Sequence, residues 1–74
     1  MYQNGNNDMK TFRATFTNTN DAIRAFEIAR DMYPVFNPRI DGCHVTTSSN
    51  IHDPDEITID WDNAGLNDYT WQYL

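Results

Sequence analysis

The spacing of the apolar residues changes once in the first half of the chain, and this change constrains the fold more than any other feature. Residues 10–17 alternate, with Phe12 and Phe16 on an apolar side and Thr and Arg opposite, which predicts a half-buried strand. Residues 22–33 place apolar side chains three and four positions apart, the period of an amphipathic helix. A run of Asn, Thr and Asp between the two segments suits a helix N-cap. Pro34 is expected to end the helix, because proline lacks an amide hydrogen.

The second half of the chain carries shorter patterns. Asp41 and Gly42 form a dipeptide that tolerates tight-turn geometry, and they predict a β-hairpin centred on them. Residues 48–56 are polar and predict a loop. Apolar side chains alternate with Thr and Asp over residues 57–62, which predicts another strand. Residues 69–74 would place three aromatic rings on one face if extended, and the pattern leaves a strand or a helical turn open.

Together these elements predict an α+β fold, with one amphipathic helix packed on a three- to four-stranded, mostly antiparallel sheet in the chain order β-α-β-β-β. Residues 1–9 are expected to form a flexible N-terminal arm, because the first eight are polar and show no period. Residues 10–74 are expected to form a single domain.

The length and the cysteine content bound the stability of the chain. A domain of 74 residues buries only about 60% of its unfolded surface. Cys43 is the single cysteine, so no internal disulfide adds stability, and a reducing, cytoplasmic setting is the simplest expectation. Additional burial would have to come from a homodimer or from docking on a larger partner. No apolar stretch is long enough to span a membrane.

Positive and negative charges are divided unequally between the two halves of the chain. The last Lys or Arg is Arg39, and the formal net charge is −6. A field of this kind attracts positively charged partners and repels nucleic acid and anionic membranes. We therefore expect a larger basic protein as the partner, itself able to bind nucleic acid, with no direct contact between this chain and nucleic acid or a membrane.

Catalytic and metal-binding patterns are weak. Asp60, Asp62 and Gly65 match three positions of an EF-hand loop, but Trp71 stands where the bidentate Glu belongs. Adjacent residues of a strand point to opposite faces, so Cys43 and its histidine neighbour do not form a nucleophile and base pair. The chain has too few His and Cys residues for a zinc site. The sequence therefore predicts no enzyme activity and no cofactor.

The remaining hypothesis is a binding protein. On the predicted strand, Asp60 and Asp62 would point the same way at about 6.7 Å, so that a row of carboxylates enters a groove built for phosphates. The candidate partner-binding residues are the acidic residues after residue 50 and the two tryptophans: Asp53, Asp55, Glu56, Asp60, Asp62, Asp68, Trp61 and Trp71. In size, acidity and lack of motifs the chain resembles small phage-encoded inhibitors, including anti-CRISPR proteins. The alternative is a structural or regulatory subunit that binds through apolar contacts.

Overall fold

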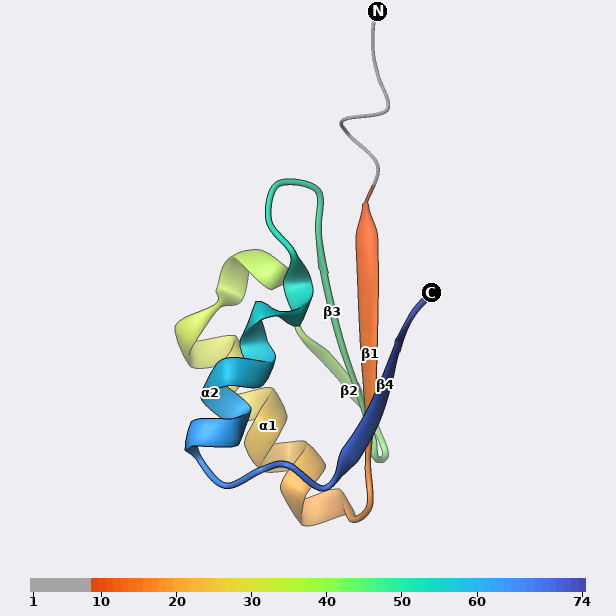
Figure 1. Ribbon diagram of the computed structural model, residues 1–74, viewed down its shortest axis with the longest axis vertical. Coiled ribbons are helices and arrows are strands. Elements are labelled where there is room, and N and C mark those ends of the chain that lie inside the picture. Colours follow the sequence, from red (N-terminus) through yellow and green to blue (C-terminus); the bar gives the residue numbers. More distant parts are fainter. Residues whose placement is uncertain (1–8) are drawn as a thin grey trace, which may run out of the picture.

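The computed structural model describes residues 9–74, and it has an α+β fold in the chain order β-α-β-β-α-β (Figure 1). The elements are β1 (Lys10–Phe16), α1 (Thr19–Met32), η2 (Pro34–Phe36), β2 (Arg39–Asp41), β3 (His44–Ser49), η3 (Pro54–Glu56), α2 (Ile57–Asn63) and β4 (Tyr69–Tyr73). This order is that of the ferredoxin-like, or split βαβ, motif. The predicted fold class is confirmed, but the predicted chain order lacked α2. The expected flexible arm falls almost entirely on residues 1–8, which lie outside the described residues.

The four strands form one antiparallel sheet in the order β2-β3-β1-β4. β1 is therefore central, with Phe12 opposite Thr47 of β3 on one side and opposite Tyr73 of β4 on the other. Figure 1 shows both helices on the same side of this sheet. No helix of residues 9–74 covers the opposite face of the sheet, which is lined by polar and charged side chains, among them Thr11, Arg13 and Thr15 of β1.

The strand and helix predicted for the first half are confirmed. The side chain of Asn18 accepts a hydrogen bond from the backbone N–H of Asp21 at 2.9 Å, which caps α1. Ala22, Ala25 and Ala29 are buried on the sheet-facing side of α1. Because alanine side chains are small, the helix backbone can approach the sheet closely. After Met32 the chain leaves the helix and enters the short 3-10 turn η2, which begins at the predicted proline.

The predicted hairpin is present, but its turn lies one residue later than expected. Asp41 pairs with His44, so the two central residues of the turn are Gly42 and Cys43. Gly42 has a φ of +61°, and it is the first of the two central residues. A positive φ at that position alone is the pattern of a type II′ turn, in which glycine avoids the strain of a side chain. β3 then continues to Ser49, into the segment predicted as a loop.

The strand predicted over residues 57–62 is wrong, because Ile57–Asn63 is the helix α2. Ile57 and Trp61 lie one helical turn apart and are both fully buried, whereas Ile59, which alternation placed beside them, is 64% exposed. The helix ends in a Schellman motif. The backbone N–H of Gly65 donates to the backbone carbonyl of Asp62 at 3.0 Å, and the N–H of Leu66 donates to the carbonyl of Trp61 at 2.8 Å. Gly65 has a φ of +82°, as this motif requires.

β4 resolves the ending that the sequence left open, since Tyr69–Tyr73 is a strand. Its three aromatic side chains lie on the helix side of the sheet. The ring centroid of Tyr69 lies 4.9 Å from that of Phe16. The ring centroids of Trp71 and Tyr73 lie 5.4 Å and 5.6 Å from that of Phe12. The last strand therefore extends the aromatic core toward the edge of the sheet.

Candidate protein-binding surface

The acidic residues of the second half lie mostly on η3, α2 and the segments that flank them. Figure 1 shows α2 and β4 on the near side of the molecule, with α1 and β2 behind them. Among the described residues, every Lys and Arg belongs to β1, α1 or β2. The charge asymmetry of the sequence is therefore also a difference between elements: η3, α2 and β4 carry no Lys or Arg, whereas Lys10 and Arg13 lie on β1, the strand beside β4. We call the segment formed by residues 53–62 the acidic face.

Lys10 is the positive side chain that reaches the acidic face. Its Nζ lies 2.8 Å from Oδ1 of Asp53, and both side chains are 59% exposed. This interaction raises the pKa of Lys10 and lowers the pKa of Asp53. Exposed ion pairs of this kind contribute little to stability, because water screens them. Asp53 is nevertheless neutralised in part, so it adds less to the negative field than its sequence position suggests.

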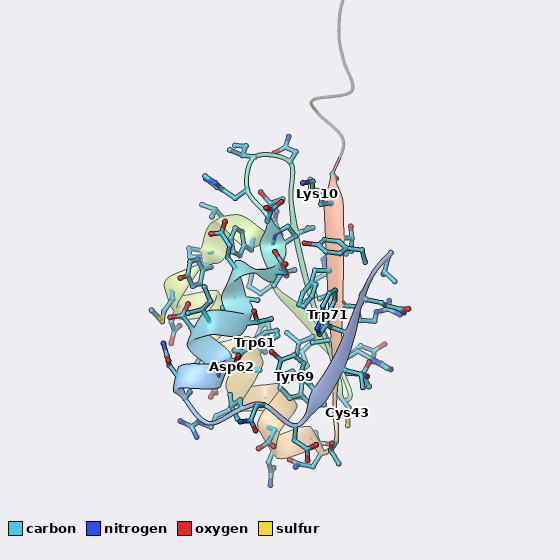
Figure 2. The ribbon with its side chains drawn as sticks, viewed as in Figure 1. Lys10, Cys43, Trp61, Asp62, Tyr69 and Trp71 are labelled. Carbon is cyan, nitrogen blue, oxygen red and sulfur yellow. The ribbon has the colours of Figure 1, made fainter. Side chains whose placement is uncertain are left out.

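Three of the carboxylates lie beside tyrosine hydroxyls. The hydroxyl of Tyr69 donates to Oδ1 of Asp62 at 3.4 Å, and Figure 2 shows these two side chains facing one another between α2 and β4. Burial and the neighbouring Asp62 raise the pKa of Tyr69. Burial raises the pKa of Tyr73 as well, and Asp55 adds to the effect.

The third such carboxylate, Asp60, faces the other helix. Its interaction with the hydroxyl of Tyr33, which follows α1, raises the pKa of that tyrosine. Oδ2 of Asp60 is buried and has no hydrogen-bond partner among residues 9–74. Successive residues of an α-helix are about 100° apart, so Asp60 and Asp62 point in nearly opposite directions. The predicted row of carboxylates at strand spacing is therefore wrong.

The two tryptophans differ completely in accessibility. Trp61 is fully buried, and its indole N–H donates to the carbonyl of Ala25 at 3.0 Å, which ties α2 to α1. Figure 2 shows it between the helices and the sheet. Trp71 is 56% exposed at the β4 edge. Trp61 is thus a core residue, and of the two tryptophans only Trp71 has the exposure of an interface anchor.

Of the candidate acidic residues, Asp55 and Asp60 are half-buried, and the other four are exposed: Asp53, Glu56, Asp62 and Asp68. A shallow hollow of about 490 Å³ lies at one end of the acidic face. The hollow is lined by the ends of β1 and β4 and by two carboxylates: Met9, Lys10, Thr11, Asp53, Asp55, Tyr73 and Leu74. Sequence reasoning missed the tyrosines and Lys10, because their proximity to the acids depends on how α2 and β4 pack.

The remaining reactive side chains have local partners. His44 Nδ1 and Thr15 Oγ1 lie 2.9 Å apart on the open face of the sheet. Cys43 is half-buried, with its Sγ 3.6 Å from Oγ1 of Thr19. No group of three His, Cys, Asp or Glu side chains within residues 9–74 is arranged to hold a metal ion. In the same part of the chain, no helix has the length and apolar content to cross a membrane.

Comparison with known protein families, with curated protein sequences and with solved structures gives no match to this chain. Its function is therefore argued from the residues and their arrangement.

Proposed function

We propose that this chain is a non-catalytic protein-binding module whose acidic face covers a basic, nucleic-acid-binding surface of a larger protein. The observation that carries the proposal is the separation of charge between elements. Glu56, Asp62 and Asp68 are exposed on η3, on α2 and just before β4, and among the described residues no Lys or Arg lies on η3, α2 or β4. Complementary fields accelerate the association of such a surface with a basic partner.

Because Ile57–Asn63 is a helix and not a strand, the spacing of the carboxylates that such a surface offers to a partner differs from the predicted one. Asp62 and Asp55 lie next to Tyr69 and Tyr73, which are four residues apart on β4, a separation of about 13 Å along a strand. The carboxylates are therefore not spaced like consecutive points of one strand. The module would compete with nucleic acid through its negative field and through individual contacts to Lys and Arg of the partner. Trp71, exposed beside this surface, would supply an apolar contact near the charged rim.

An inhibitory role, of the kind that phage-encoded anti-CRISPR and other anti-defence proteins have, is the finer part of the proposal. Its support is the small size of the chain, its acidity and the single cysteine. A protein that covers the surface on which its partner binds nucleic acid blocks that binding without any chemistry of its own.

The test uses two variants that remove equal charge from different elements of the molecule. The acidic-side variant, Glu56→Gln with Asp68→Asn, removes one charge from the acidic face and one from the segment before β4. Glu27→Gln with Asp41→Asn is the matched control on α1 and β2, and all four residues are exposed. The full chain and both variants are used for affinity capture from the native cell or its host, at low and high salt. Each captured protein is then assayed for nucleic-acid binding with and without this chain.

The proposal predicts a basic protein that the wild type and the control variant retain and that the acidic-side variant loses. Capture should weaken steeply with salt, since surface charges more than about 10 Å apart are screened at 0.1 M. Added nucleic acid should displace the module from its partner. Equal retention by both variants, or undiminished nucleic-acid binding by the captured protein, would refute the proposal.

A structural or regulatory subunit that binds through apolar contacts is the second candidate. It is favoured by the apolar side chains exposed near the β4 edge, namely Trp71 at 56% and Leu74 at 61%. This candidate predicts binding that is insensitive to salt and to the Glu56 and Asp68 changes. Trp71→Ser should then abolish capture, whereas the acidic-face proposal expects only partial weakening.

A further inference from the structure

We propose that β4 pairs with β4 of a second copy of this chain, so that two four-stranded sheets join edge to edge across a two-fold axis at Trp71. This inference does not depend on the identity of the basic partner. It rests on the free edge of the sheet, on the direction of the backbone groups of β4 and on the symmetry of its sequence.

The two edges of the sheet differ in how they are protected against pairing. β2 is only three residues long, follows Pro38 and ends in charged residues, Arg39 and Asp41, all of which discourage the addition of another strand. β4 is five residues long, Tyr-Thr-Trp-Gln-Tyr, without a charge or a proline. Figure 1 looks toward the β4 edge, and no helix or strand of residues 9–74 covers it.

The backbone of β4 is oriented to accept a further strand. In the antiparallel pair with β1, Leu74 N–H donates to the Thr11 carbonyl and Thr17 N–H donates to the Asp68 carbonyl. Hydrogen-bonded pairs alternate along an antiparallel ladder, so the even-numbered residues 68–74 bond to β1. The N–H and C=O groups of Tyr69, Trp71 and Tyr73 therefore point outward from the sheet edge.

The sequence of β4 is close to a palindrome about Trp71, which favours a second copy as the occupant. An antiparallel pairing centred on Trp71 places Tyr69 of each copy opposite Tyr73 of the other and Thr70 opposite Gln72. All three outward-facing pairs are then hydrogen-bonded, with about six hydrogen bonds because each pair exchanges two. A two-fold axis of this kind makes an isologous, closed interface.

The pairing also determines on which side of the joint sheet the helices of the two copies lie. Side chains of directly opposite residues lie on the same face of a sheet, so the two Trp71 rings meet on the helix side. Both helix layers would lie on one side of an eight-stranded sheet, with the two acidic faces flanking the pair of Trp71 rings. Trp71 at 56%, Tyr73 at 43% and Leu74 at 61% exposure would lose part of their contact with water. Because each chain carries a net charge of −6, salt should strengthen the dimer.

Two variants test the register with matched chemistry. Thr70 and Gln72 are exposed on the open face, and Gln72 lies opposite Arg13 of β1. Thr70→Glu with Gln72→Glu places like charges opposite one another twice across the proposed axis, whereas Thr70→Lys with Gln72→Glu places opposite charges there. Both share the Glu beside Arg13, so the isolated fold changes little between them. Asn20→Asp with Asn50→Asp controls for the added negative charge away from β4.

Sedimentation velocity of the full chain over concentrations up to about 1 mM measures the dimer Kd. We expect the wild type to dimerise, the Lys and Glu variant to dimerise at least as tightly, and the Glu and Glu variant to have a Kd about tenfold higher or more. The charge control should resemble the wild type. In NMR, the amides of Tyr69, Trp71 and Tyr73 should shift with concentration. A wild type that stays monomeric, or equal Kd values for the two β4 variants, would overturn the proposal.

Discussion

Replacing either isoleucine of α2 tests whether this segment is a helix or the strand that its alternation predicts. In a strand, Ile57 and Ile59 share one face and are buried together. In the helix they lie about 200° apart, and the structure shows Ile57 fully buried and Ile59 64% exposed. The same substitution at the two positions should therefore have very different effects.

Ile57→Ala removes methyl groups from a site packed among Phe12, Trp61 and other core residues. Large-to-small changes of this kind cost about 2–5 kcal/mol. A chain of 74 residues has a total stability of roughly 4–11 kcal/mol, so this variant is close to unfolding. Ile57→Val costs only about 0.5–1.5 kcal/mol and keeps the effect measurable.

At Ile59, which is exposed, the sign of the change in unfolding free energy distinguishes a helix from a strand. Ile59→Ala should be neutral or stabilise the chain by a few tenths of a kcal/mol, because alanine is the better helix former. Ile59→Val should leave stability within about 0.5 kcal/mol of the wild type. A strand would give the opposite result, since alanine is disfavoured in strands and the site would be buried.

The assay is urea unfolding at constant salt, followed by far-UV circular dichroism and by tryptophan fluorescence. The Ile57 variants should have lower unfolding midpoints with unchanged slopes, and the Ile59 variants should overlay the wild type. If Ile59→Ala costs as much as Ile57→Ala, the helix assignment and the placement of the acidic face on it are both wrong.

Three further measurements follow from local geometry. Gly65→Ala should cost about 1–2 kcal/mol in thermal unfolding, because the φ of +82° strains any side chain although space is free around it; an equal stability would contradict the Schellman ending. Asn18→Ala should cost about 1 kcal/mol through loss of the N-cap, and Asn18→Ser, which keeps an oxygen that can cap the helix, should cost less. The pKa values of Tyr33, Tyr69 and Tyr73 are raised above 10.0 in the folded chain, so the folded state holds these protons more tightly than the unfolded state. This contribution to the free energy of unfolding should be fully present below about pH 10 and should be lost as the pH rises through the raised tyrosine pKa values. Tyrosinate absorbance that develops in the folded chain at or below about pH 10 would refute this.

The proposed dimer and the proposed partner surface are separable. Loss of self-association with retained capture of a basic protein would leave the acidic face intact as a binding surface. Retained self-association without capture would leave β4 as an interface between copies. In the first case the Trp71 ring remains free for the partner, and in the second it is covered by the other copy.

The elements of the first half follow from local sequence alone. Alternation through β1, a side-chain cap at Asn18, helical spacing of small and apolar residues through α1 and a proline after it all favour the same structure. The sequence also predicts a turn at Gly42, although the central residues of the turn lie one position later in the structure than predicted. The net acidity of the second half is likewise a property of the sequence.

The α2 segment is where local patterns conflict. Its alternation favours a strand, but Asp53 and Pro54 before it and Gly65 after it are helix start and stop signals. Over seven residues these signals nearly balance, and the decision comes from packing: the helix places Ile57 and Trp61 together against α1 and β1. In the helical conformation Trp61 is buried in the core, Asp60 lies beside Tyr33, and Asp62 lies beside Tyr69.

The sequence by itself therefore determined the α+β class, the first strand and helix, and the sign of the charge in each half, because these depend on residues close together in the chain. Only the tertiary structure decided which acids are exposed, that Tyr33 after α1 and the tyrosines of β4 adjoin acidic residues, and that β4 is an edge strand of the sheet. Those features depend on contacts between segments far apart in sequence, such as β1 with β4, and no local period encodes them.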